Sequence, residues 1–210
     1  YFQPRIEGEP ISALFVAAAG DVRLIGVSRQ LVGCDWLNAS DFAYCGSVGP
    51  LHLDAASTQT ALRVGSILAE AFHLRGSFGC DLQFDATTAW LTEVNPRYTA
   101  SVEVFEHAWG FKAVDWHRRA CASFDMDGEQ GSWAFDPEDA VSDATAAKCV
   151  AKAILFAESD FVVPDGLFVD TGILAGGIPP IADVPKPGSR IAAGHPVCTL
   201  LTGGPDEAAC

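Results

Sequence analysis

The feature that most constrains the fold is an uncharged run from Ile11 to Ala19, which is rich in strand-forming side chains. The run stops at Gly20-Asp21, a typical turn pair, and an apolar pattern resumes from Val22 to Ser28. We therefore predict a β-hairpin near the start of the chain. A membrane-spanning helix needs about 18 consecutive apolar residues, and no run in this sequence approaches that length. The sequence therefore predicts no membrane partner.

A helix and a second hairpin are expected next. Apolar residues from Ser57 to Leu74, including Leu62, Ile67 and Phe72, recur at helical spacing, and Gly76 follows as a stop signal. Two strand-like segments then flank a short polar turn near residues 86–88. These segments run from Cys80 to Phe84 and from Trp90 to Val94.

Shorter elements complete this part of the chain. Ser101 is a candidate N-cap for a helix that ends at Gly110, and another helix is expected from Val114 to Ala122. The stretch from Leu31 to Leu53 contains Gly and Pro among aromatic residues and is predicted to be mostly loop.

The last third changes character. Residues 124–143 carry seven acidic side chains and no basic one, which favours a solvated connection. After it, short apolar runs are separated by Gly and Pro clusters. We predict an α+β fold, with an antiparallel sheet and flanking helices followed by a small β-rich C-terminal segment. The expected boundaries give three parts, 1–110, 111–147 and 148–210.

Charge and cysteine usage exclude several functions. The chain has 13 Lys and Arg against 27 Asp and Glu, a net charge of -14 that would repel a phosphate backbone, so nucleic acid is excluded as a partner. The seven cysteines are odd in number and never spaced as C-x-x-C, which indicates neither a zinc knuckle nor a disulfide framework and favours the cytoplasm. The only methionine is Met126. We therefore expect an internal fragment of a longer protein.

The second hairpin carries the candidate chemistry. In a strand, alternate side chains share a face, so Glu93, Asn95 and Arg97 are expected to point one way. If the turn has three residues, Asp81 lies directly opposite Glu93. Two like charges in that position cost about 0.2–1 kcal/mol, and a cation between them reverses the sign. Carboxylate and amide oxygens suit Mg²⁺ or Mn²⁺, and Arg97 could bind a phosphoryl oxygen.

The residues alone leave a second interpretation open. The same four side chains could lie on a solvent-exposed sheet face, with Arg97 neutralising the acids. Residue types and alternation do not decide between this interpretation and a metal site.

Several segments resemble the second half of an ATP-grasp domain. They are the opening run at 1–12, the helix that ends in Leu74-Arg75-Gly76, Gly79-Cys80-Asp81, and Glu93-Val94-Asn95-Pro96-Arg97. The tail from Ile181 to Thr202 is similar to the closing β-segment of ATP-grasp carboligases related to biotin carboxylase. The resemblance covers about residues 1 to 110 and implies the C-terminal half of that fold.

The resemblance also implies roles for individual residues. Asp81, Glu93 and Asn95 match the magnesium ligands of the family, and Arg97 matches the arginine that contacts phosphate or the reacting carboxylate. The opening segment matches an interdomain hinge that binds the nucleotide. The residues implied there are Pro4 and Ile6 at the adenine edge and Glu7 or Glu9 near the ribose. Ser101 and Glu103 follow Arg97 and are candidates to orient substrate, although helix capping is the favoured role for Ser101.

The function implied is an ATP-dependent ligase that joins a small-molecule carboxylate to an amine or thiol through an acyl phosphate, with ATP and Mg²⁺ or Mn²⁺. No lysine precedes Lys112, so we expect the 210-residue chain alone to be inactive. Two other functions stay open: a degenerate ATP-grasp-like module for nucleotide binding or protein interaction, and an unrelated metal-dependent phosphohydrolase. A homodimer is one oligomeric state that the sequence leaves open.

Overall fold

The computed structural model describes residues 2, 4–18, 21–84, 88–122, 149–167, 172–173, 177 and 179–210. Within these residues, eight strands form one antiparallel sheet in the order β5-β4-β1-β2-β3-β6-β10-β8, and β7 pairs separately with β9. The elements are β1 (Glu9–Ala18), β2 (Asp21–Val32), η1 (Asp35–Leu37), β3 (Tyr44–Gly49), α1 (Ala55–Phe72), β4 (Gly76–Phe84), β5 (Ala89–Asn95), α2 (Val102–Trp109), α3 (Ala113–Ala122), β6 (Cys149–Phe156), β7 (Phe161–Val162), β8 (Ile181–Ala182), β9 (Arg190–Ile191), β10 (Pro196–Gly204) and η4 (Glu207–Ala209).

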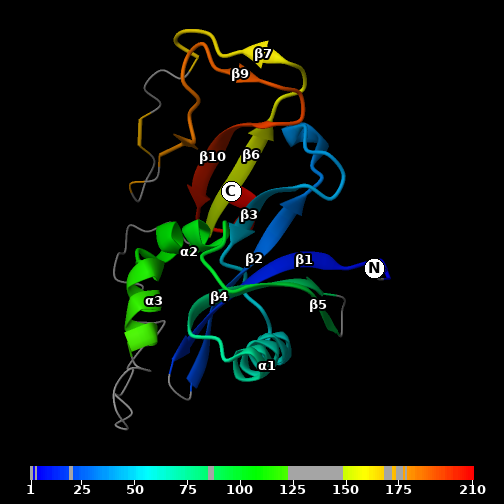
Figure 1. Cartoon of the computed structure of the whole chain (residues 1–210), viewed down its shortest axis with the longest axis vertical. Coiled ribbons are helices and arrows are strands. Elements are labelled where there is room, and N and C mark those ends of the chain that lie inside the picture. The colour runs from blue at the N-terminus through cyan, green and yellow to red at the C-terminus, as the bar shows by residue number, and fades with distance from the viewer. Residues whose placement is uncertain are drawn as a thin grey trace.

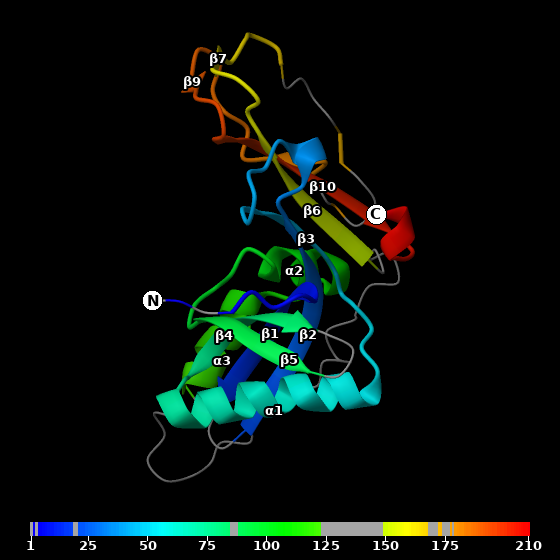
Figure 2. The same ribbon diagram turned by 90° about the vertical axis from the view of Figure 1, so that its right-hand side faces the viewer.

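Strand β1 lies inside the sheet and is buried on both faces, which explains its continuous apolar run. Ile11, Ala13 and Phe15 pack in the core on one face, together with Leu68 and Ala69 of α1. The alternate residues Leu14, Val16 and Ala18 pack in a second core with residues of α2 and α3. Figures 1 and 2 show α1 on one side of the β1–β2–β4–β5 part of the sheet and α2 and α3 on the other. The first predicted hairpin is confirmed by the antiparallel pairing of β1 and β2.

Helix α1 is found where it was predicted, but only part of its apolar set faces the sheet. Leu68 is buried, together with the small residues Ala61 and Gly65, whereas Ile67 and Phe72 are 54% and 66% exposed. The reason is a close approach to the sheet: a Cβ on Gly65 would lie 2.4 Å from the ring of Phe15. The helix also ends earlier than predicted, at His73 in the left-handed region with φ 50°. Gly76 is therefore not the stop signal but the first residue of β4.

The prediction of a loop from Leu31 to Leu53 is wrong in part. This stretch contains η1 and strand β3, which pairs with β2 and β6 in the middle of the sheet. Most side chains of β3 are small, and at Gly46 an added Cβ would lie 2.1 Å from the backbone oxygen of Lys152. Apart from Tyr44 and Val48, such a strand has none of the β-branched and aromatic residues by which strands are recognised in a sequence.

The C-terminal strands extend the same sheet. Strand β6 pairs with β3 and with β10, and β10 pairs with β8. The division of the chain at residues 110 and 147 stays a prediction, and the acidic stretch 124–143 lies outside the described residues. No helix in the described part of the chain combines the length and the hydropathy that a membrane span requires.

Candidate functional site

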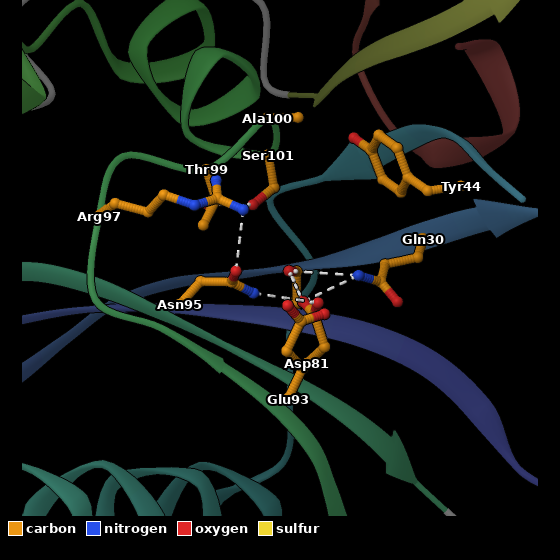
Figure 3. Close-up of a pocket in the computed structure, with 10 residues that line it drawn as sticks. Gln30, Tyr44, Asp81, Glu93, Asn95, Arg97, Thr99, Ala100 and Ser101 are labelled. Atoms are coloured by element: carbon orange, nitrogen blue, oxygen red, sulfur yellow. Dashed lines mark hydrogen bonds between the residues drawn. The ribbon is translucent and has the colours of Figure 1, made fainter.

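A polar cleft of about 170 Å³ lies at the end of the sheet face that carries α2 and α3. On β1 this face is apolar from Ala18 back to Leu14 and becomes polar at Ser12, so the cleft begins where the core ends. Figure 3 shows the side chains that converge there from β2, β3, β4, β5 and the loop before α2. The lining residues are Ser12, Gln30, Tyr44, Asp81, Glu93, Asn95, Arg97, Thr99, Ala100 and Ser101.

Asp81 and Glu93 lie directly opposite each other across β4 and β5, as the sequence predicted. The route to this register is different from the predicted one. The ladder closes at Phe84 and Ala89 rather than at Asp85, and a bulge between Asp81 and Leu82 then shifts the pairing by one residue, which leaves Thr92 unpaired in the ladder. Both carboxylates therefore point into the same cleft (Figure 3).

The carboxylate of Asp81 is half-buried and held by hydrogen bonds. Ser12 Oγ and Gln30 Nε2 both donate to Asp81 Oδ1, at 2.6 Å and 2.9 Å. Burial raises the pKa of Asp81, and the charge of Glu93 raises it further, while the bonds from Ser12 and Gln30 act in the opposite direction. The charge of Arg97 also lowers the pKa of Asp81, so the net rise comes from burial and from Glu93.

Asn95 connects Asp81 to Arg97. Its Nδ2 donates to Asp81 Oδ2 at 3.4 Å, and its Oδ1 accepts from Arg97 Nη2 at 3.0 Å. Arg97 Nη1 also donates to the backbone oxygen of Tyr98 at 3.2 Å. The structure therefore brings the four residues Asp81, Glu93, Asn95 and Arg97 into one cleft, with the guanidinium group across from the carboxylates (Figure 3).

The donor set of this cleft fits a hard divalent cation. Asp81 and Glu93 supply two converging carboxylates, and a 180° turn of the Asn95 amide group would add a neutral oxygen. Two carboxylates alone leave most of the octahedron of Mg²⁺ to water and phosphate oxygens. Consistent with such an open site, the described residues contain no group of three or more His, Cys, Asp and Glu side chains that would enclose a metal.

Ser101, a candidate from the sequence to orient substrate, lines the cleft, and the hydroxyl groups of Tyr44 and Thr99 also line it although the sequence did not assign them there. Thr99 Oγ1 and Ser101 Oγ lie 3.1 Å apart, and Tyr44 OH lies 2.9 Å from Ser47 Oγ. Burial raises the pKa of Tyr44 to about 12. The capping role favoured for Ser101 is wrong, because its side chain makes no cap hydrogen bond to α2. The proximity of Thr99 and Ser101 to Arg97 was the only available signal, whereas Ser12, Gln30 and Tyr44 come from distant segments.

Glu103 is not among the residues that line the cleft. Its Oε2 accepts a hydrogen bond of 2.5 Å from Nζ of Lys152, which is only 9% exposed, and its Oε1 lies 3.8 Å from Nε2 of His107. The interactions with His107 and then Lys152 lower the pKa of Glu103 to about 2. Glu103 therefore links α2 to β6.

The residues of the opening segment lie elsewhere. Pro4, Glu7 and Glu9 are exposed, Ile6 is partly exposed, and none of the four lines the cleft. Glu9 forms an ion pair with Arg29, which also pairs with Glu207 near the end of the chain. A nucleotide-binding role for these four residues stays a prediction.

Comparison with known proteins identifies the class of fold. Residues 1–101 match the model of a family described as an ATP-grasp domain. The structure resembles an L-amino acid ligase from Bacillus licheniformis, with a TM-score of 0.68 at 14% identity over 97% of this chain and 50% of that chain. It also resembles phosphoribosylglycinamide synthetase from Anaerococcus prevotii, with a TM-score of 0.65 at 12% identity over 96% of this chain and 49% of that chain.

A third structure is the biotin carboxylase domain of Hydrogenobacter thermophilus 2-oxoglutarate carboxylase, with a TM-score of 0.61 at 15% identity over 94% of this chain and 42% of that chain. The fold is that of ATP-grasp proteins. Residues 1–101 form part of an ATP-grasp domain, so the resemblance inferred from the sequence is confirmed. The chain spans about half the length of the solved structures it matches, and no curated protein matches the sequence.

Proposed function

We propose that this chain supplies the magnesium and phosphoryl-transfer part of an ATP-dependent ligase that joins a small carboxylate to an amine or thiol. The observation that supports this function is the convergence of Asp81, Glu93, Asn95 and Arg97 in one cleft. The ATP-grasp family of residues 1–101 supplies the link to ATP. The structure from Hydrogenobacter thermophilus is described as a complex with MgADP and bicarbonate, which is a nucleotide, a metal ion and a small carboxylate-like anion.

Asp81 and Glu93 would hold Mg²⁺ or Mn²⁺, with Asn95 as a further oxygen ligand. When bound, the ion would offset the negative charge of the nucleotide phosphates and of the transferring phosphoryl group. Holding two carboxylates side by side costs folding free energy, and a bound cation returns that cost as binding free energy. A bound cation would therefore relieve the repulsion between the carboxylates of Asp81 and Glu93.

Arg97 would stabilise the oxygens that gain charge when the substrate carboxylate attacks the γ-phosphate of ATP and an acyl phosphate forms. Its guanidinium group lies across the cleft from the carboxylates, and the bond from Nη1 to the backbone oxygen of Tyr98 orients it whichever way the Asn95 amide is turned. A charge-assisted, preorganised donor at this position stabilises the transition state more than the ground state. Attack by the amine or thiol on the acyl carbon would then release phosphate.

The 210-residue chain is expected to have little activity by itself. Among the described residues that line the cleft, Arg97 is the only cation, and nucleotide phosphates carry up to four negative charges. Further cations are needed to bind ATP tightly, and no lysine precedes Lys112 in this sequence.

The test is ADP formation by the complete gene product that contains these residues, measured with and without a panel of carboxylates and amines. We expect ADP only when an acceptor is present, and we expect Glu93→Ala and Asn95→Ala to lower kcat at least about a hundredfold with little effect on folding. Phosphate release without any acceptor would favour a phosphohydrolase. Nucleotide binding without turnover would favour a non-catalytic module, and either result would contradict the ligase.

A further inference from the structure

Asp81 is held by two neighbours that the sequence did not assign to the site. Ser12 on β1 and Gln30 on β2 both donate to the same oxygen, Asp81 Oδ1. Gln30 Nε2 also lies 3.4 Å from Ser12 Oγ, so the three side chains form a closed triangle. Because β4, β1 and β2 are adjacent strands, each corner of this triangle is fixed by the ladder of the sheet.

The two oxygens of Asp81 therefore have different surroundings. Oδ1 accepts bonds of 2.6 Å and 2.9 Å, whereas Oδ2 accepts one long bond of 3.4 Å from Asn95. Ser12 is only 4% exposed, so little water competes for its bond to Oδ1. These bonds fix the plane of the carboxylate, and Oδ2, the oxygen with fewer hydrogen bonds, lies on the side of Asn95.

We infer that Ser12 and Gln30 are positioning residues that make Asp81 a one-oxygen ligand, with Oδ2 as the oxygen offered to a divalent cation beside Glu93. This inference rests on the proposed function. An unrestrained carboxylate rotates and can bind a cation through either oxygen or both, which Mg²⁺, with its demand for near-octahedral geometry, does not favour. Partners in this position commonly change metal affinity by about 10- to 100-fold.

The test is Mn²⁺ binding by the full chain, followed by electron paramagnetic resonance of the free ion. We expect Gln30→Leu and Ser12→Ala each to weaken binding about tenfold, and Asp81→Asn to weaken it at least as much. Gln83→Leu is the matched control, because Gln83 is also a partly exposed glutamine of this sheet but does not line the cleft. It is expected to bind Mn²⁺ as the wild type does.

Two outcomes are distinguishable. If the wild type binds Mn²⁺, Asp81→Asn does not, and the Gln30 and Ser12 variants are unchanged, the inference is overturned and the metal site stands. If the wild type does not bind Mn²⁺, the metal site and the inference both fail.

A second readout needs no metal. In nuclear magnetic resonance spectra, the side-chain amide protons of Gln30 should exchange with solvent several-fold more slowly in the wild type than in Asp81→Asn. Equal exchange rates in two well-folded proteins would contradict the hydrogen bond on which the positioning depends. Backbone spectra of the same samples show whether each variant is folded.

Discussion

Asp81 on β4 and Glu93 on β5 lie opposite each other immediately after the ladder shifts by one residue at Thr92. The hydroxyl of Thr92 donates to the backbone oxygen of Asp81 at 2.9 Å, so the bulged residue of β5 is still bonded to the neighbouring strand β4. A bulge re-aims the side chains that follow it. Here it accompanies two carboxylates that face the same cleft.

The first prediction concerns the repulsion between the carboxylates of Asp81 and Glu93. In the absence of divalent ions, Glu93→Gln should leave the free energy of unfolding unchanged or raise it by up to about 1 kcal/mol, because it removes the repulsion with Asp81. With saturating Mn²⁺ the wild type should become more stable than Glu93→Gln, since only the wild type gains stability from the ion. Urea unfolding with and without Mn²⁺ measures both. A variant less stable by the same amount in both conditions would contradict this account.

The second prediction concerns the link between α2 and β6. The pKa of Glu103 is lowered to about 2, so the folded state binds fewer protons at this group than the unfolded state does. The stabilisation is present above about pH 4.5 and is lost as the pH falls toward 2, with an amplitude of no more than about 2 kcal/mol after solvent screening.

Glu103→Gln should flatten this part of the stability profile, measured by urea unfolding between pH 2 and 6. Glu106→Gln is a useful comparison in the same helix, because Glu106 contacts Tyr98 and the backbone of Ala113 rather than Lys152. If both variants keep the acid-dependent loss seen in the wild type, Glu103 is not its source.

The third prediction tests the close approach of α1 to the sheet. Gly65→Ala should lower the free energy of unfolding by about 1–3 kcal/mol, although alanine favours helices, because the added Cβ would lie 2.4 Å from the ring of Phe15. Phe15→Leu should recover part of this loss in the double variant. Additive effects in that double-mutant cycle would show that the two residues do not meet.

The fold was largely readable from local patterns. The apolar run of β1 and the turn pair after it predicted the first hairpin, and the strand-like segments of β4 and β5 predicted the second one. The register of Asp81 and Glu93 was right because two errors cancelled: the turn is one residue longer than assumed, and the bulge takes up the difference.

Other features depend on contacts that a local pattern does not record. Helix α1 packs against the sheet through Gly65 and Ala61 rather than through Ile67, because the short distance between helix and sheet decides which side chains fit. Ser12, Gln30 and Tyr44 reach the cleft only because β1, β2 and β3 follow β4 in this order across the sheet. No spacing in the sequence indicates that adjacency.

The metal site is tested most directly by a crystal structure of the chain grown with Mn²⁺, with anomalous diffraction to locate the ion. We expect an anomalous peak between the carboxylates of Asp81 and Glu93, at about 2.0–2.3 Å from Asp81 Oδ2. A map without a peak in this cleft at saturating Mn²⁺, with the two side chains well ordered, would contradict it.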